Sequence, residues 1–307
     1  MALLLLEPAE KEYIWGGNRL RERFGKKMEG DKLAETWELS CHADGLSTIK
    51  LGEYSGMTLR DYLAENPTAS GTKCRGFSDF PLMIKLIDAN DNLSIQVHPN
   101  DEYALRNEGQ YGKTEMWYIV DCAEGAFIYL GFSRDIDDLE YRSRIVDGTL
   151  QEVLNKVTVH KGDCFFIKSG TVHAIGKGTL VAEIQQNSNV TYRVFDYNRT
   201  DKTGAKRELH IDKAVDVSKL SRPERWESGG HLASCEYFTS DAITLNGSIR
   251  QYAGEDSFHS LLVTSGNGKI STKEEEINVR SGDSVFITAG SGEYTIKGDL
   301  SILLTTV

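Results

Sequence analysis

Residues 93–99, Leu-Ser-Ile-Gln-Val-His-Pro, carry the side chains that most directly suggest chemistry. Successive side chains of a β-strand point to opposite faces. In a strand at this point, the leucine, isoleucine and valine would share an apolar face, whereas Ser94, Gln96 and His98 would share a polar one. This row predicts a strand that lines a site inside a β fold, although an ordinary solvent-facing strand has the same alternation.

A second strand-like segment, 113–120, places Lys113 and Glu115 on one face. The triplet Gly112-Lys113-Thr114 is similar to the end of a phosphate-binding P-loop. That interpretation fails because Asn107 occupies the position of the motif's first glycine, and because the segment that follows has the pattern of a strand, not of a helix. Lys113 and Glu115 are therefore candidates for the polar site.

Further polar groups lie in three later segments. His173 is flanked by glycine-bearing turns. Glu183 and Gln185 share a face of one apolar segment, and Thr191 and Arg193 share a face of the next. Each of these residues, taken singly, also fits an ordinary surface position, and Glu183 and Arg193 could form a simple ion pair.

His98, Glu115 and His173 together supply two imidazoles and one carboxylate, with Gln96 beside His98. This is the ligand chemistry of an open first-row metal site, and it suits zinc, iron or manganese. Spacing alone is not diagnostic, because the ligands come from three separate segments. The remaining histidines are expected to be structural or exposed: His42, His160, His210, His231 and His259.

Glycine is frequent (29 residues) and proline is rare (5 residues) in this chain of 307 residues. Short apolar runs recur between glycine-bearing turns, the rhythm of an all-β sandwich or barrel. Helical spacing is rarer, so helices packed beside a β core are expected, not alternating βαβ units. Strands are predicted within 127–130, 164–167, 180–184, 260–263, 284–287 and 300–307. Helices are predicted at 59–63, ended by Asn66-Pro67, at 150–157, and at 103–106 with Asn100 or Asp101 as the cap.

A weak internal repeat relates residues 159–167 to residues 279–287. Both copies read Val-x-x-Gly-Asp followed by an apolar run, which predicts one turn-plus-strand unit used in two similar β domains. The two copies differ at a candidate functional residue. Glu293 in the second copy occupies the position that His173 has in the first. Chemistry is therefore expected in the first domain.

The chain has 35 basic and 46 acidic residues, a net charge of −11 and a pI near 5.2. This balance argues against a general nucleic-acid or membrane-surface binder, which needs net basic patches. The apolar run 2–6 is too short for a signal-peptide core, and no run reaches the roughly 20 residues of a membrane helix. Five scattered cysteines without a CxxC pair indicate a reduced, cytoplasmic protein.

Together these segments resemble type I mannose-6-phosphate isomerase (phosphomannose isomerase), a zinc enzyme family of the cupin superfamily. Residues 93–99 are similar to the family's Leu-Ser-Ile-Gln-x-His-Pro metal strand, and Lys113-Thr114-Glu115 is similar to its Lys-x-Glu. Glu183, followed ten positions later by Arg193, resembles its glutamate and catalytic arginine. The resemblance covers most of residues 7–200, and the length resembles the short bacterial form.

The resemblance implies a mainly β fold of two cupin-like (jelly-roll) β-barrel domains with a few flanking helices. Residues 1–228 would form the catalytic, metal-binding domain, and residues 229–307 a smaller cupin-like domain without a metal site. Residues 221–230, with Pro223 and a glycine pair, are the best linker candidate. We expect a cytoplasmic monomer or weak homo-oligomer whose partner is a small sugar phosphate, with neither nucleic acid nor membrane as a partner.

The resemblance also assigns the metal ligands. His98, Glu115 and His173 would bind one Zn²⁺ ion per chain in the N-terminal domain, and Gln96 matches a fourth ligand in longer relatives. Bound zinc would polarise oxygens or organise substrate and water without redox side chemistry.

The implied reaction interconverts mannose 6-phosphate and fructose 6-phosphate through an enediol. Such a reaction needs a base, an acid and positive charge near the developing oxyanion. The resemblance makes Arg193, Lys113 and Glu183 catalytic, with Glu183 as the candidate base. It makes Lys85, Ser94 and Arg193 substrate-binding, with Lys85 or Arg193 as the partner of the phosphate.

Other classes fit part of the pattern. Two histidines and a glutamate also suit a mononuclear Fe(II) oxygenase, although Lys85, Lys113 and Arg193 favour a sugar phosphate. A non-catalytic sugar-phosphate binding protein is a second alternative, against which the complete ligand set argues. A two-cupin storage or scaffold protein is a third, and it would hold no tightly bound metal.

Overall fold

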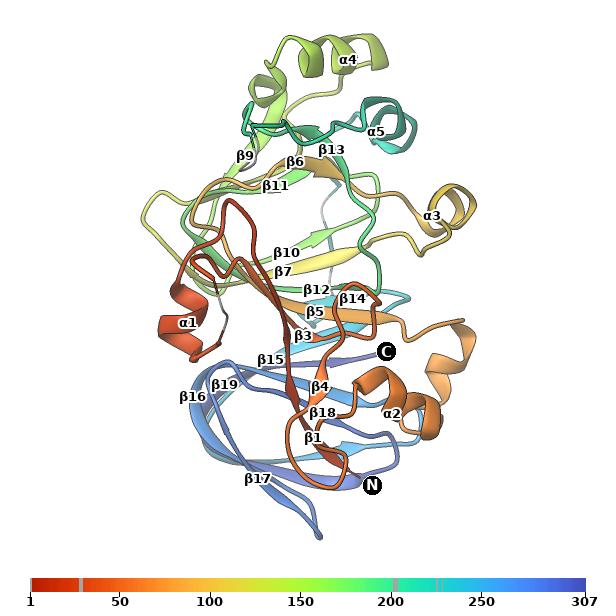
Figure 1. Ribbon diagram of the computed structural model, residues 1–307, viewed down its shortest axis with the longest axis vertical. Helices are drawn as coiled ribbons and strands as arrows, with labels where there is room; N and C mark the ends of the chain where they lie inside the picture. The colour runs from red at the N-terminus through yellow and green to blue at the C-terminus, as the bar shows by residue number, and fades with distance from the viewer. Residues whose placement is uncertain (1, 28–29, 201–203, 225, 228) are drawn as a thin grey trace. The chain divides into compact units, whose positions relative to one another are not determined.

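Strands make up most of the regular structure in the computed structural model, which describes residues 2–27, 30–200, 204–224, 226–227 and 229–307 (Figure 1). The predicted mainly β class with a few flanking helices is confirmed. The chain forms two compact units. Unit 1 comprises Met1–Lys11, Asn18–Leu86 and Ser228–Val307, and unit 2 comprises Glu12–Gly17 and Ile87–Glu227.

The described residues of unit 1 form thirteen elements and share a fourteenth, β5 (Leu82–Asp88), with unit 2. Those before β5 are β1 (Leu3–Glu7), β2 (Ala9–Lys11), α1 (Arg19–Phe24), β3 (Glu35–Leu39), β4 (Thr48–Ile49), α2 (Leu59–Glu65) and the 3₁₀ helix η1 (Thr72–Gly76). Those near the C-terminus are β14 (Ala233–Ser234), β15 (Thr239–Ala253), β16 (His259–Ser271), β17 (Glu276–Arg280), β18 (Ser284–Ile287) and β19 (Gly292–Thr306).

Unit 2 holds the remaining elements. Its strands are β6 (Ile95–Val97), β7 (Glu115–Cys122), β8 (Phe127–Phe132), β9 (Leu154–Thr158), β10 (Cys164–Ile167), β11 (His173–Ile175), β12 (Thr179–Gln186) and β13 (Tyr192–Phe195). Its helices are α3 (Asp101–Glu108), α4 (Asp138–Val146), the 3₁₀ helix η2 (Leu150–Val153) and α5 (Ile211–Val217). Among the described residues, no helix combines the length and apolar character that crossing a membrane requires.

Every predicted apolar run coincides with a strand, apart from the final residue of the chain. Two of the predicted helices are confirmed as well, and their caps explain their bounds. α2 starts where the Thr58 hydroxyl accepts a hydrogen bond from the Asp61 amide, and it ends at Asn66, directly before Pro67. α3 starts at Asn100, whose side chain accepts from the Tyr103 amide.

The helix predicted at 150–157 is wrong. Residues Leu150–Val153 form a single 3₁₀ turn, and Leu154–Thr158 is strand β9, which pairs antiparallel with β8. Leu154 lies opposite Phe132, and Val157 lies opposite Ile128. A buried turn followed by a strand gives the same apolar spacing as a helix, and pairing with a neighbouring strand overrides a weak local preference.

Two sheets of unit 2 position the predicted polar row. One has the strand order β13-β6-β11-β8-β9, and the other includes β10, β7 and β12 as neighbours. Ile95 and Val97 of β6 are fully buried in an apolar cluster with Tyr141 of α4 and Ala214 of α5. Figure 1 shows both helices over that sheet. One face of β6 therefore packs on helices, as the alternation predicted, and the opposite face carries the polar side chains.

The internal repeat is a structural repeat. In each copy the glycine has a positive φ, 92° at Gly162 and 90° at Gly282. The aspartate after it accepts a hydrogen bond from a backbone amide three residues earlier, His160 in the first copy and Arg280 in the second. Strands β10 and β18 follow. One local turn therefore starts an equivalent strand in each unit.

Unit 1 has no counterpart of the predicted metal ligand His173. Glu293 stands at that position in the repeat, and its side chain is 58% exposed. An apolar cluster that includes Leu261, Val285 and Tyr294 fills this unit instead. The predicted linker, 221–230, contains residues 225 and 228, which lie outside the described residues, and the boundary at 228 stays a prediction.

The repeated turn supplies a matched pair of substitutions. We expect Gly162→Ala to lower the free energy of unfolding by about 1–2 kcal/mol, because an L side chain is strained at this φ although no atom lies within 4 Å of the new Cβ. Gly282→Ala should cost more, because its Cβ would lie 2.5 Å from Phe24 Cβ. Urea unfolding of both variants measures the difference, and equal losses would contradict the steric explanation.

Candidate metal centre

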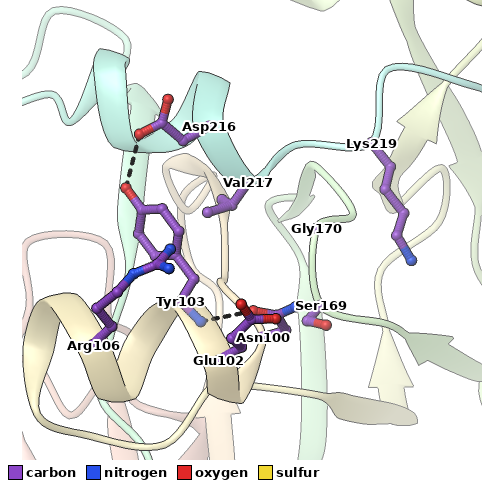
Figure 2. Close-up of a pocket in the computed structure, with 9 residues that line it drawn as sticks. All are labelled: Asn100, Glu102, Tyr103, Arg106, Ser169, Gly170, Asp216, Val217 and Lys219. Carbon is purple, nitrogen blue, oxygen red and sulfur yellow. Dashed lines mark hydrogen bonds between the residues drawn. The ribbon is translucent and has the colours of Figure 1, made fainter.

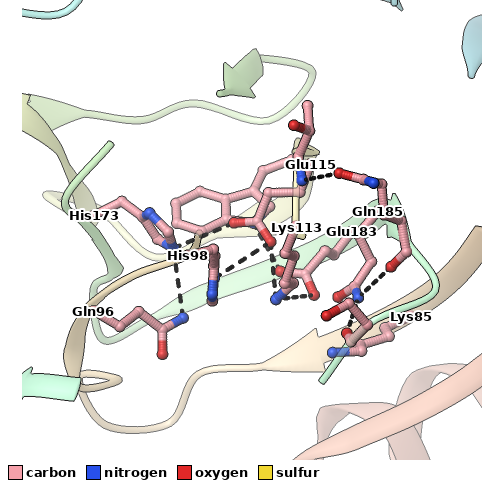
Figure 3. Close-up of polar contacts among 12 residues, drawn as sticks. Lys85, Gln96, His98, Lys113, Glu115, His173, Glu183 and Gln185 are labelled. Carbon is pink, nitrogen blue, oxygen red and sulfur yellow. Dashed lines mark hydrogen bonds and ion pairs between the residues drawn. The ribbon is translucent and has the colours of Figure 1, made fainter. Parts of the chain in front are cut away.

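The structure brings His98, Glu115 and His173 into one buried cluster (Figure 3). His98 follows the end of β6, Glu115 begins β7 and His173 begins β11. Their ligand atoms all lie within 4.8 Å of one another. The Nε2 atom of His173 is 3.3 Å from Glu115 Oε1, and that of His98 is 3.8 Å from Glu115 Oε2. Two facing sheets of unit 2 thus supply the three side chains.

Backbone carbonyls fix the tautomer of both imidazoles. The Nδ1 atom of His98 is 2.8 Å from the Val190 carbonyl oxygen, and that of His173 is 2.8 Å from the Thr171 carbonyl oxygen. A carbonyl only accepts hydrogen bonds, so each Nδ1 carries the proton and donates it. In a neutral ring, Nε2 then turns a lone pair toward Glu115. Burial lowers the pKa of His173 to about 4, which keeps this ring neutral near pH 7.

This donor set fits a divalent metal ion. Two imidazole lone pairs and a carboxylate all act as acceptors toward one buried space, and electron pairs facing one another need a cation between them. Histidines whose Nδ1–H is held by a carbonyl are typical metal ligands, since that hydrogen bond orients the ring. Among the described residues, this is the one group of three such side chains close enough to share an ion.

Lys113 and Glu183 extend the cluster. The Lys113 ammonium lies 2.9 Å from Glu115 Oε2 and 3.6 Å from Glu183 Oε1, and all three side chains are buried. The indole N–H of Trp117 donates to Glu183 Oε2 at 2.9 Å. Glu183 is therefore held as a carboxylate between a cation and a neutral donor. The predicted catalytic lysine and glutamate lie side by side next to the cluster.

Gln96 and Arg193 lie on the same sheet as His173. In the antiparallel register, Gln96 of β6 is directly opposite His173 of β11 on one side and Arg193 of β13 on the other. Opposite residues of antiparallel strands point to the same face, so these three side chains share it. The Gln96 amide nitrogen is 3.5 Å from His173 Nε2. Coordination by Gln96 would use its oxygen, which needs the amide turned over.

Arg193 is fixed by backbone contacts. Its amide donates to His210 Nδ1 at 3.2 Å, and the His210 amide donates to the Arg193 carbonyl at 2.8 Å. The guanidinium donates to the Glu208 carbonyl at 3.1 Å. Burial lowers the pKa of Arg193, and the neighbouring Arg207 lowers it further, although a guanidinium stays protonated.

More positive charge surrounds Asp196, three residues after Arg193. Both Arg199 and Arg207 form ion pairs with its carboxylate, and the Arg207 Nε–H donates to Oδ2 at 2.7 Å. These hydrogen bonds lower the pKa of Asp196, although burial opposes them. Residues 193–207 carry five basic and two acidic residues, an excess of positive charge on an acidic chain.

Two further residues, Ser94 and Lys85, are predicted to bind the substrate. Ser94 is buried just before β6, on the predicted polar side of that strand. Lys85 of β5 belongs to unit 1, where its ammonium is 3.8 Å from Glu35 Oε2 and lies over the ring of Trp37. Contact of either residue with a substrate stays a prediction.

A separate polar pocket of about 270 Å³ lies beside α3 and α5 (Figure 2). None of the residues that line it is a predicted ligand. It borders the same backbone, because the Gly170 amide donates to the His98 carbonyl at 2.8 Å. Figure 2 shows Tyr103 donating to Asp216 across one wall, at 3.0 Å. The pocket therefore borders the same chain segments as the cluster, but none of the predicted site side chains lines it.

Sequence reasoning missed Trp117. Its indole joins Glu183 by the hydrogen bond, and its ring meets His173 edge to face at 5.3 Å between centroids. Strand parity could have found it, since Trp117 is two residues after Glu115 and so points to the same face. The carbonyls of Thr171 and Val190 could not have been found, because backbone contacts leave no signal in residue type.

The chain was compared with known proteins. The model of the type I phosphomannose isomerase catalytic domain matches residues 3–120, and that of the mannose-6-phosphate isomerase cupin domain matches 229–307. A probable mannose-6-phosphate isomerase of Bacillus subtilis is 40% identical over 98% of both chains. That of Streptococcus mutans is 38% identical over 98% of this chain and 96% of its own. The chain belongs to the type I phosphomannose isomerase family.

A solved structure agrees with this membership. The crystal structure of mannose 6-phosphate isomerase from Bacillus subtilis superposes with a TM-score of 0.92 at 35% identity, over 100% of both chains. The phosphomannose isomerase catalytic model includes His98 and Glu115 within its match, and His173 lies beyond residue 120 in the region shared with the full-length relatives. The cupin match at 229–307 confirms the cupin character predicted for the C-terminal segment.

The lowered pKa of His173 predicts how stability depends on pH in chelator-treated protein. The folded state keeps the ring neutral down to about pH 4, whereas the unfolded chain binds a proton near the ordinary value of 6.5. The free energy of unfolding should therefore fall by about 3 kcal/mol between those pH values on account of this group. In the His173→Gln variant, the decrease in the free energy of unfolding over this pH range should be smaller by that amount.

Urea unfolding at several pH values measures the effect. His160→Gln is the matched control, because the His160 side chain is 78% exposed. Identical pH dependence in the wild type and the His173→Gln variant would refute the neutral assignment of the ring.

Proposed function

We propose that this chain interconverts mannose 6-phosphate and fructose 6-phosphate, as the names of its full-length relatives indicate. One observation carries the proposal from this chain's own residues. The buried His98–Glu115–His173 cluster lies directly beside Lys113 and Glu183, so a metal site and a carboxylate–ammonium pair share one space. Moving a proton between neighbouring carbons of a sugar needs a base and stabilisation of negative charge on the adjacent oxygens, and this space supplies groups for each.

The metal we propose is zinc, one ion per chain, held by His98, Glu115 and His173 within residues 1–228, with Gln96 as a fourth ligand. Two imidazoles and one carboxylate suit a catalytic zinc site, which keeps a position for water or substrate. Such an ion, when bound, polarises substrate oxygens without redox chemistry. Unit 2 supplies all four side chains.

Proton transfer is assigned to the Glu183–Lys113 pair. Once the sugar is open, Glu183 takes the proton from C2 and Lys113 gives a proton to the C1 carbonyl oxygen, which yields the enediol. Glu183 then returns its proton to C1, and the C2 hydroxyl gives its proton back to Lys113 as C2 becomes the ketone carbon. Lys113 stands where it can stabilise negative charge on these oxygens. Trp117 holds one Glu183 oxygen and leaves the other beside Lys113.

The phosphate is assigned to the basic residues near β13. Arg193 lies in the row with Gln96 and His173, two strands from His173, which is roughly 10 Å at the usual strand spacing. Arg199 and Arg207 add positive charge around Asp196. Guanidinium groups bind phosphate through paired hydrogen bonds. This cluster supports an anionic substrate, with Lys85 and Ser94 as further substrate contacts.

The C-terminal segment, 229–307, is proposed to be a cupin-like domain without metal. The exposed Glu293 at the position of His173 supports this, as does the apolar cluster that fills unit 1. Its contribution is then structural.

Metal removal tests the main proposal. Turnover of mannose 6-phosphate, coupled to detection of fructose 6-phosphate, should be abolished by a chelator and restored by zinc. Arg193→Ala should lower kcat/KM at least about 100-fold, because it removes charge-assisted hydrogen bonds worth several kcal/mol together. Arg222→Ala is the control, since Arg222 is an exposed residue of the same unit.

Three results would contradict this assignment. Full activity in protein shown by elemental analysis to hold no metal would remove the cluster from its role. No turnover by folded, zinc-loaded protein would reject the reaction itself. Oxygen uptake with an iron-loaded sample would instead favour an oxygenase.

Trp117→Phe tests the support of Glu183. Phenylalanine keeps a ring against His173 and removes only the N–H donor, so kcat should fall about 10- to 100-fold with little change in KM. Trp226→Phe is the control, because Trp226 stacks on Phe166 at 3.8 Å and lies outside the cluster. Steady-state kinetics and thermal unfolding separate the two effects. Equal kcat in both variants would show that the indole N–H does not matter.

A further inference from the structure

Strand β15 has an edge that, in the described part of the chain, no strand covers over most of its length. β14 pairs only with Thr239 and Ser240 of β15, whereas the residues after them pair on one side alone, with β19. The other edge strands among the described residues are short, from two to five residues: β2, β4, β9, β10, β13 and β17. The β15 edge therefore differs from every other sheet edge in that part of the chain.

Alternation shows which backbone groups face this opening. The Ser240 carbonyl accepts from the Leu232 amide at 3.0 Å, so the backbone groups of Ser240 point away from β19. The pairing of β15 with β19 runs from Thr239 to Ala253 without a bulge. Every second residue then presents its N–H and C=O to the opening. These residues are Ala242, Thr244, Asn246, Ser248, Arg250 and Tyr252.

The edge has little of the usual protection. Native edge strands are kept from pairing by charged side chains, above all lysine, by proline, by a bulge, by shortness or by a covering segment. Arg250 is the one charged residue among the six that face outward. Residues 241–253 contain neither lysine nor proline, and the side chains of all six outward residues are exposed. Ile243, Leu245 and Ile249 pack on the apolar cluster of unit 1. This packing holds the strand in place, so it is a ready template for another strand.

We propose that a second copy of this chain pairs with this edge, β15 against β15, antiparallel about a two-fold axis at Gly247. Only this register uses the whole of 241–253 in both copies. It sets Ala242 opposite Tyr252, Thr244 opposite Arg250 and Asn246 opposite Ser248. All six outward residues of each copy then donate and accept one hydrogen bond.

The side chains of the edge are compatible with this register. Leu245 of one copy would lie opposite Ile249 of the other on the apolar face, a favourable cross-strand pair. The two charged residues of the edge, Asp241 and Arg250, would each lie opposite an uncharged residue, so no like charges meet. A self-complementary edge fits a copy of itself, which is what an isologous two-fold contact requires.

The size of the proposed β15–β15 interface indicates how tightly the two copies would bind. Thirteen paired residues at the usual rise make a strip about 43 Å long and one strand wide. Such a strip lies at the small end of specific interfaces. The dimer should therefore form near millimolar concentration and dissociate in the low-micromolar range.

Sedimentation equilibrium across that concentration range tests the dimer. Asn246→Pro removes an outward N–H near the axis and should weaken dimerisation about tenfold or more, because both copies lose a bond. Asn246→Ala, which keeps the N–H, is the matched control and should dimerise like the wild type. Catalytic turnover and melting temperature show whether each variant is folded.

Hydrogen exchange of the wild type provides a second measurement that needs no variant. Amides in 241–253 should exchange more slowly at high protein concentration than at low concentration. A wild type that stays monomeric near millimolar concentration would overturn the proposal. So would a dimer unaffected by Asn246→Pro, or slow exchange that appears only when a different protein is added.

Discussion

Three electron-pair donors converge on one buried space in this protein, and the rest of the site follows from that constraint. His98 and His173 donate their Nδ1–H groups to backbone carbonyls, and both Nε2 atoms face Glu115. Burial lowers the pKa of His173, so this ring is neutral near pH 7 and brings no positive charge. A nearby cation, Lys113, lies 2.9 Å from Glu115 and offsets the negative charge of that carboxylate. A divalent ion accounts for the lone pairs that remain.

The polar side chains of the site are held by two facing sheets. In each sheet, one face of the strands is apolar and packs on neighbouring elements, and the other face carries the polar side chains. Strand β6 turns Ile95 and Val97 toward α4 and α5 and turns Gln96 toward the site. The apolar side anchors the strand, so the polar side can carry costly, desolvated groups. β7 and β12 act likewise from the other sheet, where Trp117 and Glu183 are opposite in register and joined by a hydrogen bond.

The same local turn occurs in both units, although, among the described residues, only one of the units carries the cluster of polar side chains. Gly162 and Gly282 adopt the same left-handed conformation, and an aspartate closes each turn in the same way. Beyond the turn the two units differ, since one carries His173 among polar neighbours and the other carries an exposed Glu293 over an apolar interior. A shared fold therefore does not imply a shared site. The C-terminal segment, 229–307, matches the cupin domain of mannose-6-phosphate isomerase.

The sequence by itself predicted the strands at the apolar runs, two helices with the end of one and the cap of the other, and the grouping of His98, Glu115 and His173, because alternation and residue chemistry are local properties. It could not determine that 154–158 is a strand, since only pairing with β8 decides between strand and helix there. Nor could it show the contact of Trp117 with Glu183, which needs two strands brought into register. The tautomers of the histidines were likewise decided by tertiary structure alone, because backbone carbonyls from distant segments fix them.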